Sequence, residues 1–499
     1  MSSQLSAAPP VHESGPEVDE RTRSGPHLRA NALGVAALLF FVLSAQAPLT
    51  GIAGASPIAM VLGNGTGVPG AYLLTGMVIA LFAVGFIAMS RHVVNAGAFY
   101  AYIGEGLGRR LGGGSALVAV TAYATIQAAM YGLYGFVVAG LVAQYLGIDI
   151  AWWGCALITM AVIQVLGVLG IDIGARVLAL LVLAEISLLL LFDVVVLFSG
   201  GGPEGISVAS SFSPSEVFSG APGVALTFAV ASMFGFESTA IYSEETRRPE
   251  KTVPRATYLS VALITGFFAL TTWMFISSYG ASRAVGEAGA ALESGDSTAF
   301  VFGAVASELG SWTADVLPFL LATSLLAGML AFHNSINRYL FALSRDDLLP
   351  AALDRVNRHG APWAASVVQT TIAVLLVMPF AILGQDPVLT LFSWFGGVAV
   401  LGVMVLYFLT SLGVIRFFRR TAVDRRPWQT LIAPSLASIA IAFVVWLILD
   451  NFTTLIGGSS GTALWLILAV PAAFVVGLLL DLRRSHASQL DPVLDQSRP

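Results

Sequence analysis

The stretch SMFGFESTAIYSEETRRPEKTVPRA, Ser232 to Ala256, places a glutamate, Glu237, inside an apolar segment and then becomes densely charged. An ionisable side chain at membrane depth is costly unless it faces a bundle interior or a water-filled cavity. Glu237 is therefore a candidate functional residue, with a purely structural hydrogen bond to the backbone as the alternative. The charged half holds Glu244, Glu245, Arg247, Arg248 and Lys251. We expect the two glutamates to pair with these basic residues near an inner gate, or the cluster simply to anchor the end of a membrane span.

The whole chain is strongly apolar. Of its 499 residues, 57% are hydrophobic and only 11% are charged, which no water-soluble domain of this length matches. The sequence therefore predicts a polytopic membrane protein whose surroundings are a lipid bilayer. A single cysteine, Cys155, excludes an internal disulfide framework and a multi-cysteine metal site. The net charge of -5 gives no reason to expect a nucleic-acid partner.

Twelve apolar stretches are long enough to span a bilayer as helices, which takes roughly 20 residues each. They lie near residues 33–62, 70–90, 115–146, 151–170, 175–199, 221–244, 254–280, 312–343, 363–383, 387–415, 428–450 and 462–482. Transmembrane strands would alternate apolar and polar residues, and these stretches do not. We therefore predict an all-α protein with 12 transmembrane helices, a disordered tail at 1–30 and a second tail at 485–499.

Lysine and arginine positions predict the orientation, because cytoplasmic loops retain these residues. With the N-terminus inside, 23 of the 24 lysines and arginines fall on the cytoplasmic side, and only Arg283 lies outside. The expected location is the plasma membrane, with both tails in the cytoplasm. The basic clusters are then determinants of topology.

Motifs for nucleotide, metal or nucleophile chemistry are missing from the sequence. The glycine runs LGNGTG from Leu62 and GEGLG from Gly104 neither follow a strand nor open a soluble helix, so they lack the context of a dinucleotide site. There is no Walker A motif, no H-E-x-x-H motif and no nucleophile elbow. This argues against an ATP-driven pump and a membrane enzyme, and no cofactor or metal is expected. A channel would show rings of charge or a filter repeat, which are also absent.

Two of the apolar stretches carry residues that interrupt helices. SAQAPLTGIAGASPIAM, Ser44 to Met60, concentrates prolines and glycines at which helix propagation is costly. A second interruption is predicted between Ser232 and Glu237, around Gly235. The breaks fall in the first and sixth predicted helices, which are corresponding positions of two five-helix units. Such paired breaks are typical of an inverted-repeat transporter with its site at the midplane.

The broken backbones predict a site for a zwitterion, because half-helix amino ends attract anions and carboxyl ends attract cations. The residues expected to bind it are Thr50, Gly51, Ile52, Ala53, Gly54, Ser232, Met233, Phe234, Gly235 and Phe236. A carboxylate is expected over the Gly51–Gly54 amides, and an amino group near the carbonyls of Thr50 and of Ser232 to Phe234. The apolar members favour a neutral amino acid over a polyamine. The alternative is that the glycines permit close helix packing and the apolar side chains form ordinary core.

Four titratable residues within the spans are candidates for ion coupling or gating: Glu237, Glu185, Asp193 and His333. A buried carboxyl group or a histidine can bind and release a proton, so proton coupling is the leading hypothesis. Sodium coupling would instead use oxygens such as those of Thr323, Ser324 or Ser335. Hydroxyl groups in helices more commonly bond to their own backbone.

Three motifs resemble the amino acid-polyamine-organocation (APC) transporter superfamily, in particular its bacterial amino acid permeases. FGFESTAIYSEETRRPEKTVPRA, from Phe234, is similar to the helix 6 signature of that superfamily. NRYLFALSRDDLLPAALDRVNRHGAPWAA, from Asn337, resembles its segment linking helices 8 and 9, and NAGAFYAYIGEGLG, from Asn95, the stretch before helix 3. The three together span most of residues 33–415. They are specific to the superfamily and not to a substrate.

The resemblance implies a LeuT-type 5+5 inverted repeat with broken helices 1 and 6. The transporter core would be residues 31–415, with repeats at about 31–200 and 217–415, and peripheral helices 11 and 12 at 427–484. It also implies alternating-access uptake or exchange of an amino acid, a polyamine or another organic amine, without enzymatic activity. Helix 1 lacks the common Gly-x-Gly-Ile-Phe form, and no tryptophan occupies the helix 6 bend. These departures leave recognition of the substrate side chain open.

Overall fold

The structure is a computed structural model that describes residues 33–93, 95, 97–169, 173–358 and 360–495. The described chain is helical, and its one β-type contact is an isolated bridge between Leu33 and Thr246. The expected all-α class is therefore confirmed. The predicted disordered tail at 1–30 lies outside the described residues.

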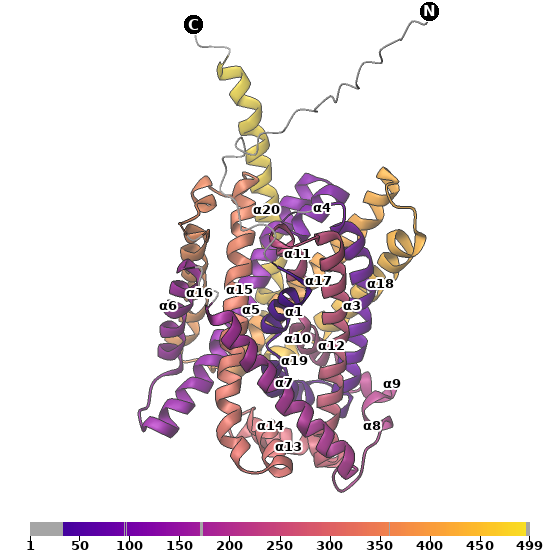
Figure 1. Cartoon of the computed structure of the whole chain (residues 1–499), viewed down its shortest axis with the longest axis vertical. Helices are drawn as coiled ribbons and strands as arrows, with labels where there is room; N and C mark the ends of the chain where they lie inside the picture. The colour runs from indigo at the N-terminus through magenta and orange to yellow at the C-terminus, as the bar shows by residue number, and fades with distance from the viewer. Residues whose placement is uncertain (1–32, 94, 96, 170–172, 359, 496–499) are drawn as a thin grey trace, which may run out of the picture.

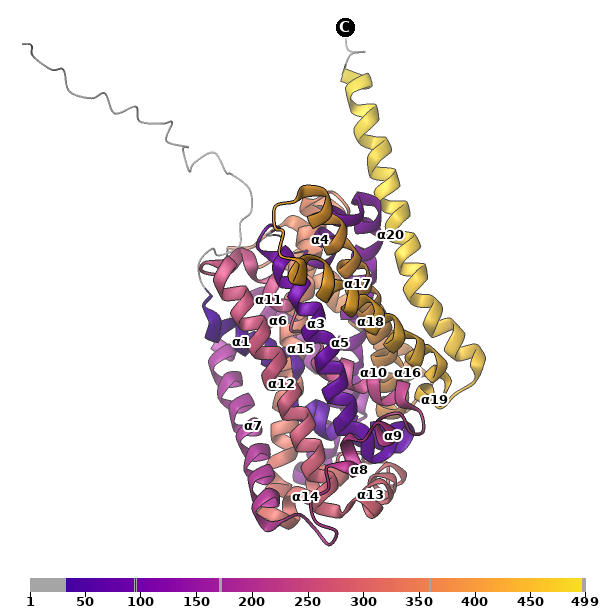
Figure 2. The ribbon, with the colours of Figure 1, turned by 90° about the vertical axis from the view of Figure 1, so that its right-hand side faces the viewer.

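Thirteen helices of twelve or more residues lie in the described part of the chain, and twelve of them form the bundle (Figure 1). They are α1 (Val35–Gln46), α3 (Val68–Ser90), α5 (Arg109–Leu146), α6 (Trp152–Leu169), α7 (Ile173–Ser199), α10 (Pro222–Met233), α12 (Pro249–Tyr279), α15 (Trp312–Arg345), α16 (Trp363–Ile382), α17 (Ser393–Thr421), α18 (Ala433–Asp450) and α20 (Ser460–Asp495). α13 (Ala281–Glu293), of similar length, lies in a connection at one end. Figure 2 shows α20 along one side of the bundle, with its last turns extending beyond it.

Shorter helical segments occupy the breaks and connections. The α-helical ones are α2 (Ser56–Ala59), α4 (Phe99–Leu107), α8 (Ala209–Phe212), α9 (Pro214–Val217), α11 (Ser238–Ile241), α14 (Ala299–Leu309) and α19 (Phe452–Ile456). Wider π-type turns are η2 (Thr50–Ala55), η3 (Met60–Asn64), η7 (Pro387–Phe392) and η8 (Trp428–Ile432), and tighter 3-10 turns are η4 (Gly65–Gly67), η5 (Ser243–Glu245) and η6 (Ala351–Asp354). α13 and α14 cover the end of the bundle opposite α4 and α20 (Figure 1).

Eleven segments of the described chain are long and apolar enough to cross a membrane. The predicted count was twelve, and the difference lies in the first segment, Val35–Ser90, which is counted as a single run of 56 residues. At 1.5 Å per residue this run is far longer than one crossing of a hydrocarbon layer about 30 Å thick. It bends within its length, because Gly65 adopts a φ of 59° between η3 and α3. Twelve crossings remain a prediction.

Both predicted helix interruptions are present. α1 ends at Gln46, where Ala47 takes a left-handed conformation (φ 43°) ahead of Pro48, and the chain resumes as the wide turn η2. α10 ends at Met233, after which Phe234 is extended and Gly235 has a φ of 111°. A residue with a side chain rarely adopts that second conformation, so glycine is required there. The two breaks lie against each other inside the bundle.

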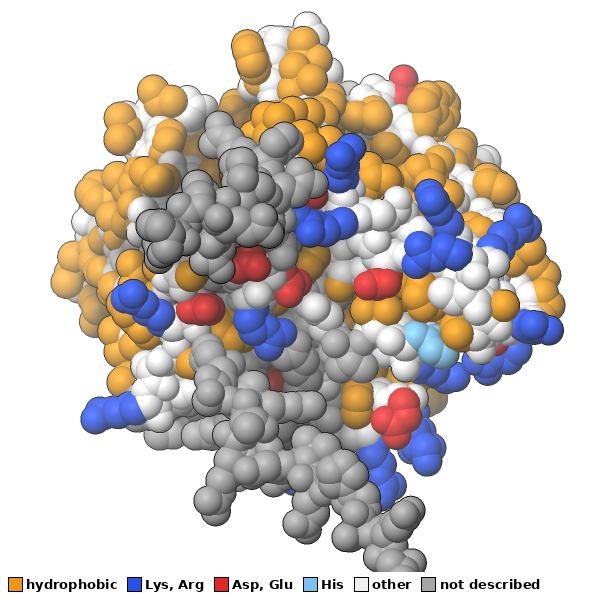
Figure 3. All heavy atoms as spheres, turned by 90° about the horizontal axis from the view of Figure 1, so that it is seen from above, with side chains coloured by type: hydrophobic (Ala, Val, Ile, Leu, Met, Phe, Trp, Pro, Cys, Tyr) orange, Lys and Arg blue, Asp and Glu red, His pale blue; other side chains and the backbone are white. Residues whose placement is uncertain are grey.

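The basic residues gather at one end of the bundle. Figure 3 shows arginine and lysine side chains scattered over the end that carries α4 and the last turns of α20. Arg283 lies in α13, at the opposite end. This segregation agrees with the positional pattern read from the sequence. Which end faces the cytoplasm remains a prediction.

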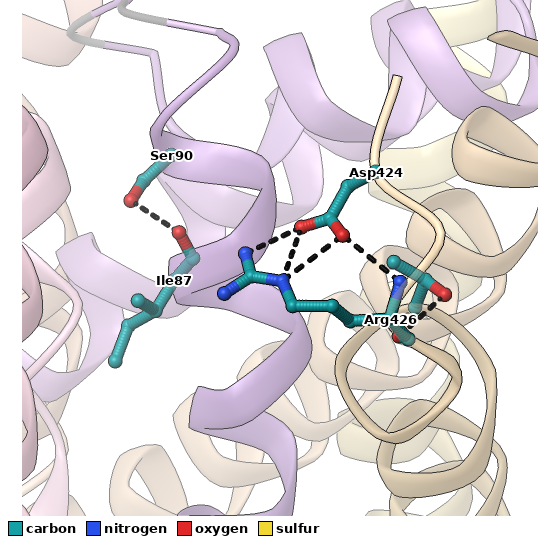
Figure 4. Close-up of polar contacts among 5 residues, drawn as sticks. Ile87, Ser90, Asp424 and Arg426 are labelled. Carbon is teal, nitrogen blue, oxygen red and sulfur yellow. Dashed lines mark hydrogen bonds and ion pairs between the residues drawn. The ribbon is translucent and has the colours of Figure 1, made fainter. Parts of the chain in front are cut away.

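The connection between α17 and η8 is closed by an ion pair (Figure 4). Arg426 Nε and Nη2 donate to the two oxygens of Asp424 at 2.5 to 3.1 Å, and the Arg426 backbone N–H donates to Oδ1 at 3.0 Å. The hydrogen bonds from Arg426 lower the pKa of Asp424 to about 2. Because the pair is lost only as pH falls toward that value, the ion pair persists at physiological pH. Nearby, Ser90 Oγ closes the end of α3 by donating to Ile87 O at 3.0 Å.

Candidate functional site

A small cavity lies where the two broken helices meet. Its volume is about 40 Å³. The lining residues are Ala45, Gln46, Ala47, Thr50, Gly51, Ala55, Ile126, Met130, Phe228, Ala231, Ser232, Phe332, Phe392 and Gly396. No ionisable side chain is among them. The wall is thus apolar and aromatic, apart from Gln46, Thr50, Ser232 and the backbone of the break.

At the break in the first helix, one backbone carbonyl accepts two hydrogen bonds. Thr50 N and Gly51 N both donate to Ala47 O, at 2.8 and 3.2 Å. Pro48 has no N–H to donate, which removes one bond that a continuous helix would need. Leu49 N finds its acceptor outside the helix, in Glu185 Oε1 of α7 at 3.4 Å. The side chain of Glu185, from a neighbouring helix, therefore replaces a lost helical acceptor, because buried backbone N–H groups need a partner.

Polar side chains connect the two breaks. Gln46 Nε2 donates to Met233 O at 3.2 Å, which joins the end of α1 to the end of α10. The Tyr72 hydroxyl of α3 lies 3.2 Å from Ser232 Oγ and 3.4 Å from Gly51 O. Gln46 Oε1 and Thr50 Oγ1 are buried and have no hydrogen-bond partner among the described residues. Both atoms belong to residues that line the cavity, so unused hydrogen-bonding capacity lies beside it.

Three of the ten predicted binding residues line the cavity: Thr50, Gly51 and Ser232. The other seven are buried beside it without forming its wall, namely Ile52, Ala53, Gly54, Met233, Phe234, Gly235 and Phe236. A side chain at Gly54 would meet Leu133 of α5, so that glycine serves close helix packing. Substrate binding by the ten residues remains a prediction.

Several residues of the cavity wall are not among the ten that the sequence predicts. Gln46 is an amide within an apolar stretch, two residues before Pro48, and that combination was a usable signal. Phe228 lies in the broken helix α10, one helical turn before Ser232, so its place beside the break could have been predicted. Phe332, Phe392 and Gly396 come from other helical segments, and nothing in the sequence around them points to the site. Only the packing of distant segments brings them together.

Glu237 is fully buried directly after the second break, and both oxygens of its carboxylate accept hydrogen bonds. Tyr123 OH of α5 donates to Oε1 at 3.0 Å, and Tyr407 OH of α17 donates to Oε2 at 3.2 Å. Gly235 N donates to Oε2 at 3.1 Å, so the carboxylate also holds the extended turn in place. Tyr123 lies edge-on to Phe234. Glu237 therefore connects the broken helix to two long helices through tyrosine hydroxyls.

The two acidic residues of α7 occupy separate places. Glu185 Oε1 accepts from Ser324 Oγ of α15 at 2.9 Å as well as from Leu49 N, so it lies beside the first break. Asp193 Oδ2 accepts from Thr271 Oγ1 of α12 at 2.7 Å. Each carboxyl group is buried and keeps one oxygen without a hydrogen-bond partner among the described residues. Glu185 is thus the nearer of the two to the helix break.

His333 belongs to a different network. Its Nε2 lies 2.9 Å from Ser366 Oγ of α16, and Ser366 donates to Gln164 Oε1 of α6 at 3.1 Å. Thr370 Oγ1 donates to the same Gln164 oxygen at 2.5 Å. His333 therefore connects α15, α16 and α6, away from the cavity that its neighbour Phe332 lines.

The expected pairing of the charged cluster after Glu237 is wrong for Glu245. Its carboxylate accepts from Arg338 of α15, with Nε at 2.6 Å and Nη2 at 3.3 Å. The guanidinium also lies 4.6 Å from the centre of the Tyr242 ring. Arg247, Arg248 and Lys251 are instead exposed on the surface. Glu245 is turned inward, so its partner comes from a helix 93 residues further along the chain.

We predict that this pair contributes measurably to stability, because both side chains are largely buried, at 19% and 11% exposure. Removing one charge leaves the other without a full partner, which costs about 1–3 kcal/mol. Glu245→Gln and Arg338→Gln should each lower the melting temperature in detergent, and the double variant should be little worse than either. Additive losses in the double variant would show that the two residues do not act as a pair.

The protein is a polytopic helical membrane protein with two interrupted helices around a central cavity. Its residues 40–485 match the family described as "Amino acid permease", which covers most of the chain, and the protein belongs to this family of the APC superfamily. A branched-chain amino acid permease of Lactococcus lactis is 24% identical over 83% of this chain and 87% of its own length. An L-lysine transport protein of Corynebacterium glutamicum is 27% identical over 62% of each chain. A proline-specific permease of Emericella nidulans is 27% identical over 51% of this chain and 48% of its own.

Proposed function

We propose that the protein is a secondary active transporter that moves a neutral, apolar amino acid across the plasma membrane by alternating access. The observation that carries the proposal is the cavity at the two helix breaks, with unsatisfied polar atoms on Gln46 and Thr50 and aromatic side chains beside them. Membership of the amino acid permease family supports amino acid transport. The chain acts on its substrate by carrying it, not as an enzyme.

The wall of the cavity offers the substrate two kinds of contact, polar and aromatic. The α-carboxylate and amino groups bind at Thr50, Gly51, Gln46 and Ser232, where polar atoms and the broken backbone are available. The side chain lies against aromatic residues such as Phe228, Phe332 and Phe392. A lysine or polyamine side chain would need an acidic partner, and no acidic residue lines the cavity. This favours a neutral substrate such as that named for the Lactococcus relative.

Alternating access explains the small size of the cavity. A volume of about 40 Å³ holds one or two waters and not an amino acid. The half-helices must therefore move apart to admit substrate, and the breaks at Ala47 and Gly235 are the natural hinges. We propose that they work within a LeuT-type repeat of 12 crossings, in which Val35–Ser90 crosses twice.

Proton coupling through Glu237 is the proposed source of energy. A carboxylate without a cationic partner is costly to keep charged in the bundle interior, so protonation and substrate binding are expected to be linked. Glu185, Asp193 and His333 are the other candidates. Sodium coupling is the alternative. Ser324 donates to Glu185 and Thr323 donates to Leu320 O of its own helix, and the oxygen of a donating hydroxyl still has lone pairs that can bind a cation.

Uptake by liposomes reconstituted with the protein tests this function. Labelled leucine, valine, proline, lysine and putrescine would be offered under a proton gradient or a sodium gradient, each imposed alone. We expect accumulation of a neutral apolar amino acid under the proton gradient. Accumulation of lysine or putrescine only, or accumulation driven by sodium only, would contradict the substrate class or the coupling ion respectively.

Orientation gives a separate prediction. We expect the face with α4 and the end of α20 to be cytoplasmic and α13 to be extracellular. In a Cys155→Ala background, a cysteine replacing the exposed Gly286 of α13 should react with an impermeant maleimide from outside intact cells. A cysteine replacing the exposed Ala352 of η6 should react only after the membrane is opened. Reaction of both from the same side would contradict this topology.

A further inference from the structure

Three buried tyrosines lie in a row between Glu237 and a second cavity at the end of the bundle that carries α4. They are Tyr123 of α5, Tyr339 of α15 and Tyr100 of α4. We propose that their hydroxyl groups relay a proton from Glu237 to Asp346 and so into that second cavity, by a route separate from the substrate cavity. The inference rests on the proposed proton coupling and names the path by which the proton leaves.

The first step is a direct hydrogen bond. Tyr123 OH donates to Glu237 Oε1 at 3.0 Å. When Glu237 carries a proton, the carboxyl group becomes the donor and the same hydroxyl the acceptor, because a phenol does both. The hydroxyl hydrogen of Tyr123 is then free to turn toward the next group.

Tyr339 is the middle of the row. Its ring centre lies 6.1 Å from that of Tyr123 and 5.6 Å from that of Tyr100, so it contacts both. Its hydroxyl is buried and has no hydrogen-bond partner among the described residues. A buried phenol without a partner is unusual and costs stability. The hydroxyls of Tyr123 and Tyr100 therefore make no hydrogen bond with it, and the relay is open at Tyr339 in this conformation. It is complete only when the Tyr339 hydroxyl, or a water beside it, bridges the two neighbouring hydroxyls.

The last step reaches a polar cavity. Tyr100 OH donates to Asp346 Oδ2. Both residues line a cavity of about 400 Å³, together with Asn95, Glu105 and Arg109, which is ample for water. Arg109 pairs there with Asp481 of α20 at 3.0 Å, and Arg345 adjoins Asp346 in the chain. Burial and the bond to Asp346 hold the pKa of Tyr100 well above its usual range, so Tyr100 stays protonated and acts as a donor.

The relay is neutral at every tyrosine. Each hydroxyl accepts a proton from the group on the Glu237 side and passes its own to the group on the Asp346 side. Glu237 loses one proton and Asp346 gains one, which it releases to water in the polar cavity. Every O–H bond that breaks is replaced by one that forms, and rotation of the hydroxyls resets the row.

Tyr339→Phe is the test, because it removes only the hydroxyl without a partner. Tyr131→Phe of α5 is the matched control, since Tyr131 is equally buried and lies outside the row. Three quantities would be measured in liposomes: substrate counterflow without a gradient, accumulation under a proton gradient, and proton movement followed with an entrapped pH dye. We expect Tyr339→Phe to keep counterflow within about twofold and to lose at least tenfold in gradient-driven accumulation and substrate-linked proton movement, whereas Tyr131→Phe keeps all three.

Other results would contradict either the relay alone or the relay together with the proton coupling. Wild-type accumulation and proton movement in Tyr339→Phe would overturn the relay alone. Equal loss of counterflow and accumulation would also overturn it, since Tyr339 would then matter for the substrate cycle as a whole. Failure of the wild-type protein to couple transport to protons would overturn the proposed coupling and the relay together.

Discussion

Glu237→Gln is expected to abolish accumulation of substrate against its gradient while leaving exchange close to normal. The proton hypothesis requires a group that titrates, and glutamine has nearly the same shape without titrating. A pH difference of one unit supplies about 1.4 kcal/mol per proton, or a tenfold concentration ratio. Loss of coupling should therefore bring the accumulation ratio from about tenfold per pH unit down to one.

The geometry explains why glutamine should be tolerated. Its amide oxygen can occupy the place of Oε2, where Gly235 N and Tyr407 OH donate. Its amide nitrogen then faces Tyr123, whose hydroxyl can accept instead of donating. Glu237→Ala leaves three donors without an acceptor, each costing about 1–3 kcal/mol, so that variant should lose both activities.

The measurement compares counterflow and gradient-driven uptake for both variants in the same liposomes. If Glu237→Gln accumulates substrate at the wild-type level, Glu237 does not carry the proton. Glu185 would then be the next candidate, because it bonds Leu49 N at the first break.

The second large effect is expected from filling the substrate cavity. Gly396 of α17 lines the cavity, and a Cβ placed there would meet no other atom within 4 Å. Gly396→Val should therefore fold normally and occupy the space that the substrate needs. We expect substrate affinity to fall by at least about a hundredfold. Loss of a single contact would cost about 1–3 kcal/mol, and a side chain that occupies the space of the ligand costs more than that.

The chain offers a matched control for this substitution. A Cβ at Gly266 of α12 would likewise meet no other atom within 4 Å, but this glycine lies on the exposed surface of the bundle. Gly266→Val makes the same chemical change in a helix without touching the cavity. Binding of labelled substrate would be measured for both purified variants. Their melting temperatures would be measured as well, to show that both are folded equally well. Wild-type affinity in Gly396→Val would place the substrate site elsewhere.

The fold was predictable because its signals are local. Apolar length gives the spans, and proline, glycine and a glutamate within such spans mark the breaks at Ala47 and Gly235. These residues interrupt the helix at their own positions, so the interruption can be predicted from the local sequence. The number of crossings remains a prediction, because Val35–Ser90 is one continuous apolar run with a turn at Gly65 inside it.

The wall of the cavity was less predictable, because it depends on how distant segments pack. Gly54 and Gly51 look alike in the sequence, and a side chain at either would meet a neighbour, Leu133 for Gly54 and Phe268 for Gly51. Only Gly51 lines the cavity. The wide turn η2 sets which side of the segment faces inward. The partner of Glu245 was missed for a similar reason: nearby basic residues face solvent, and Arg338 arrives from α15.

An experimental structure with a transported amino acid bound tests the central claim most directly. We predict density for the substrate between Thr50 and Gly51 on one side and Ser232 on the other, with its side chain toward Phe228, Phe332 and Phe392, and with the two half-helices further apart than they are here. Substrate density confined to the polar cavity at Tyr100 and Arg109, with the space between the breaks closed, would contradict the assignment of the site.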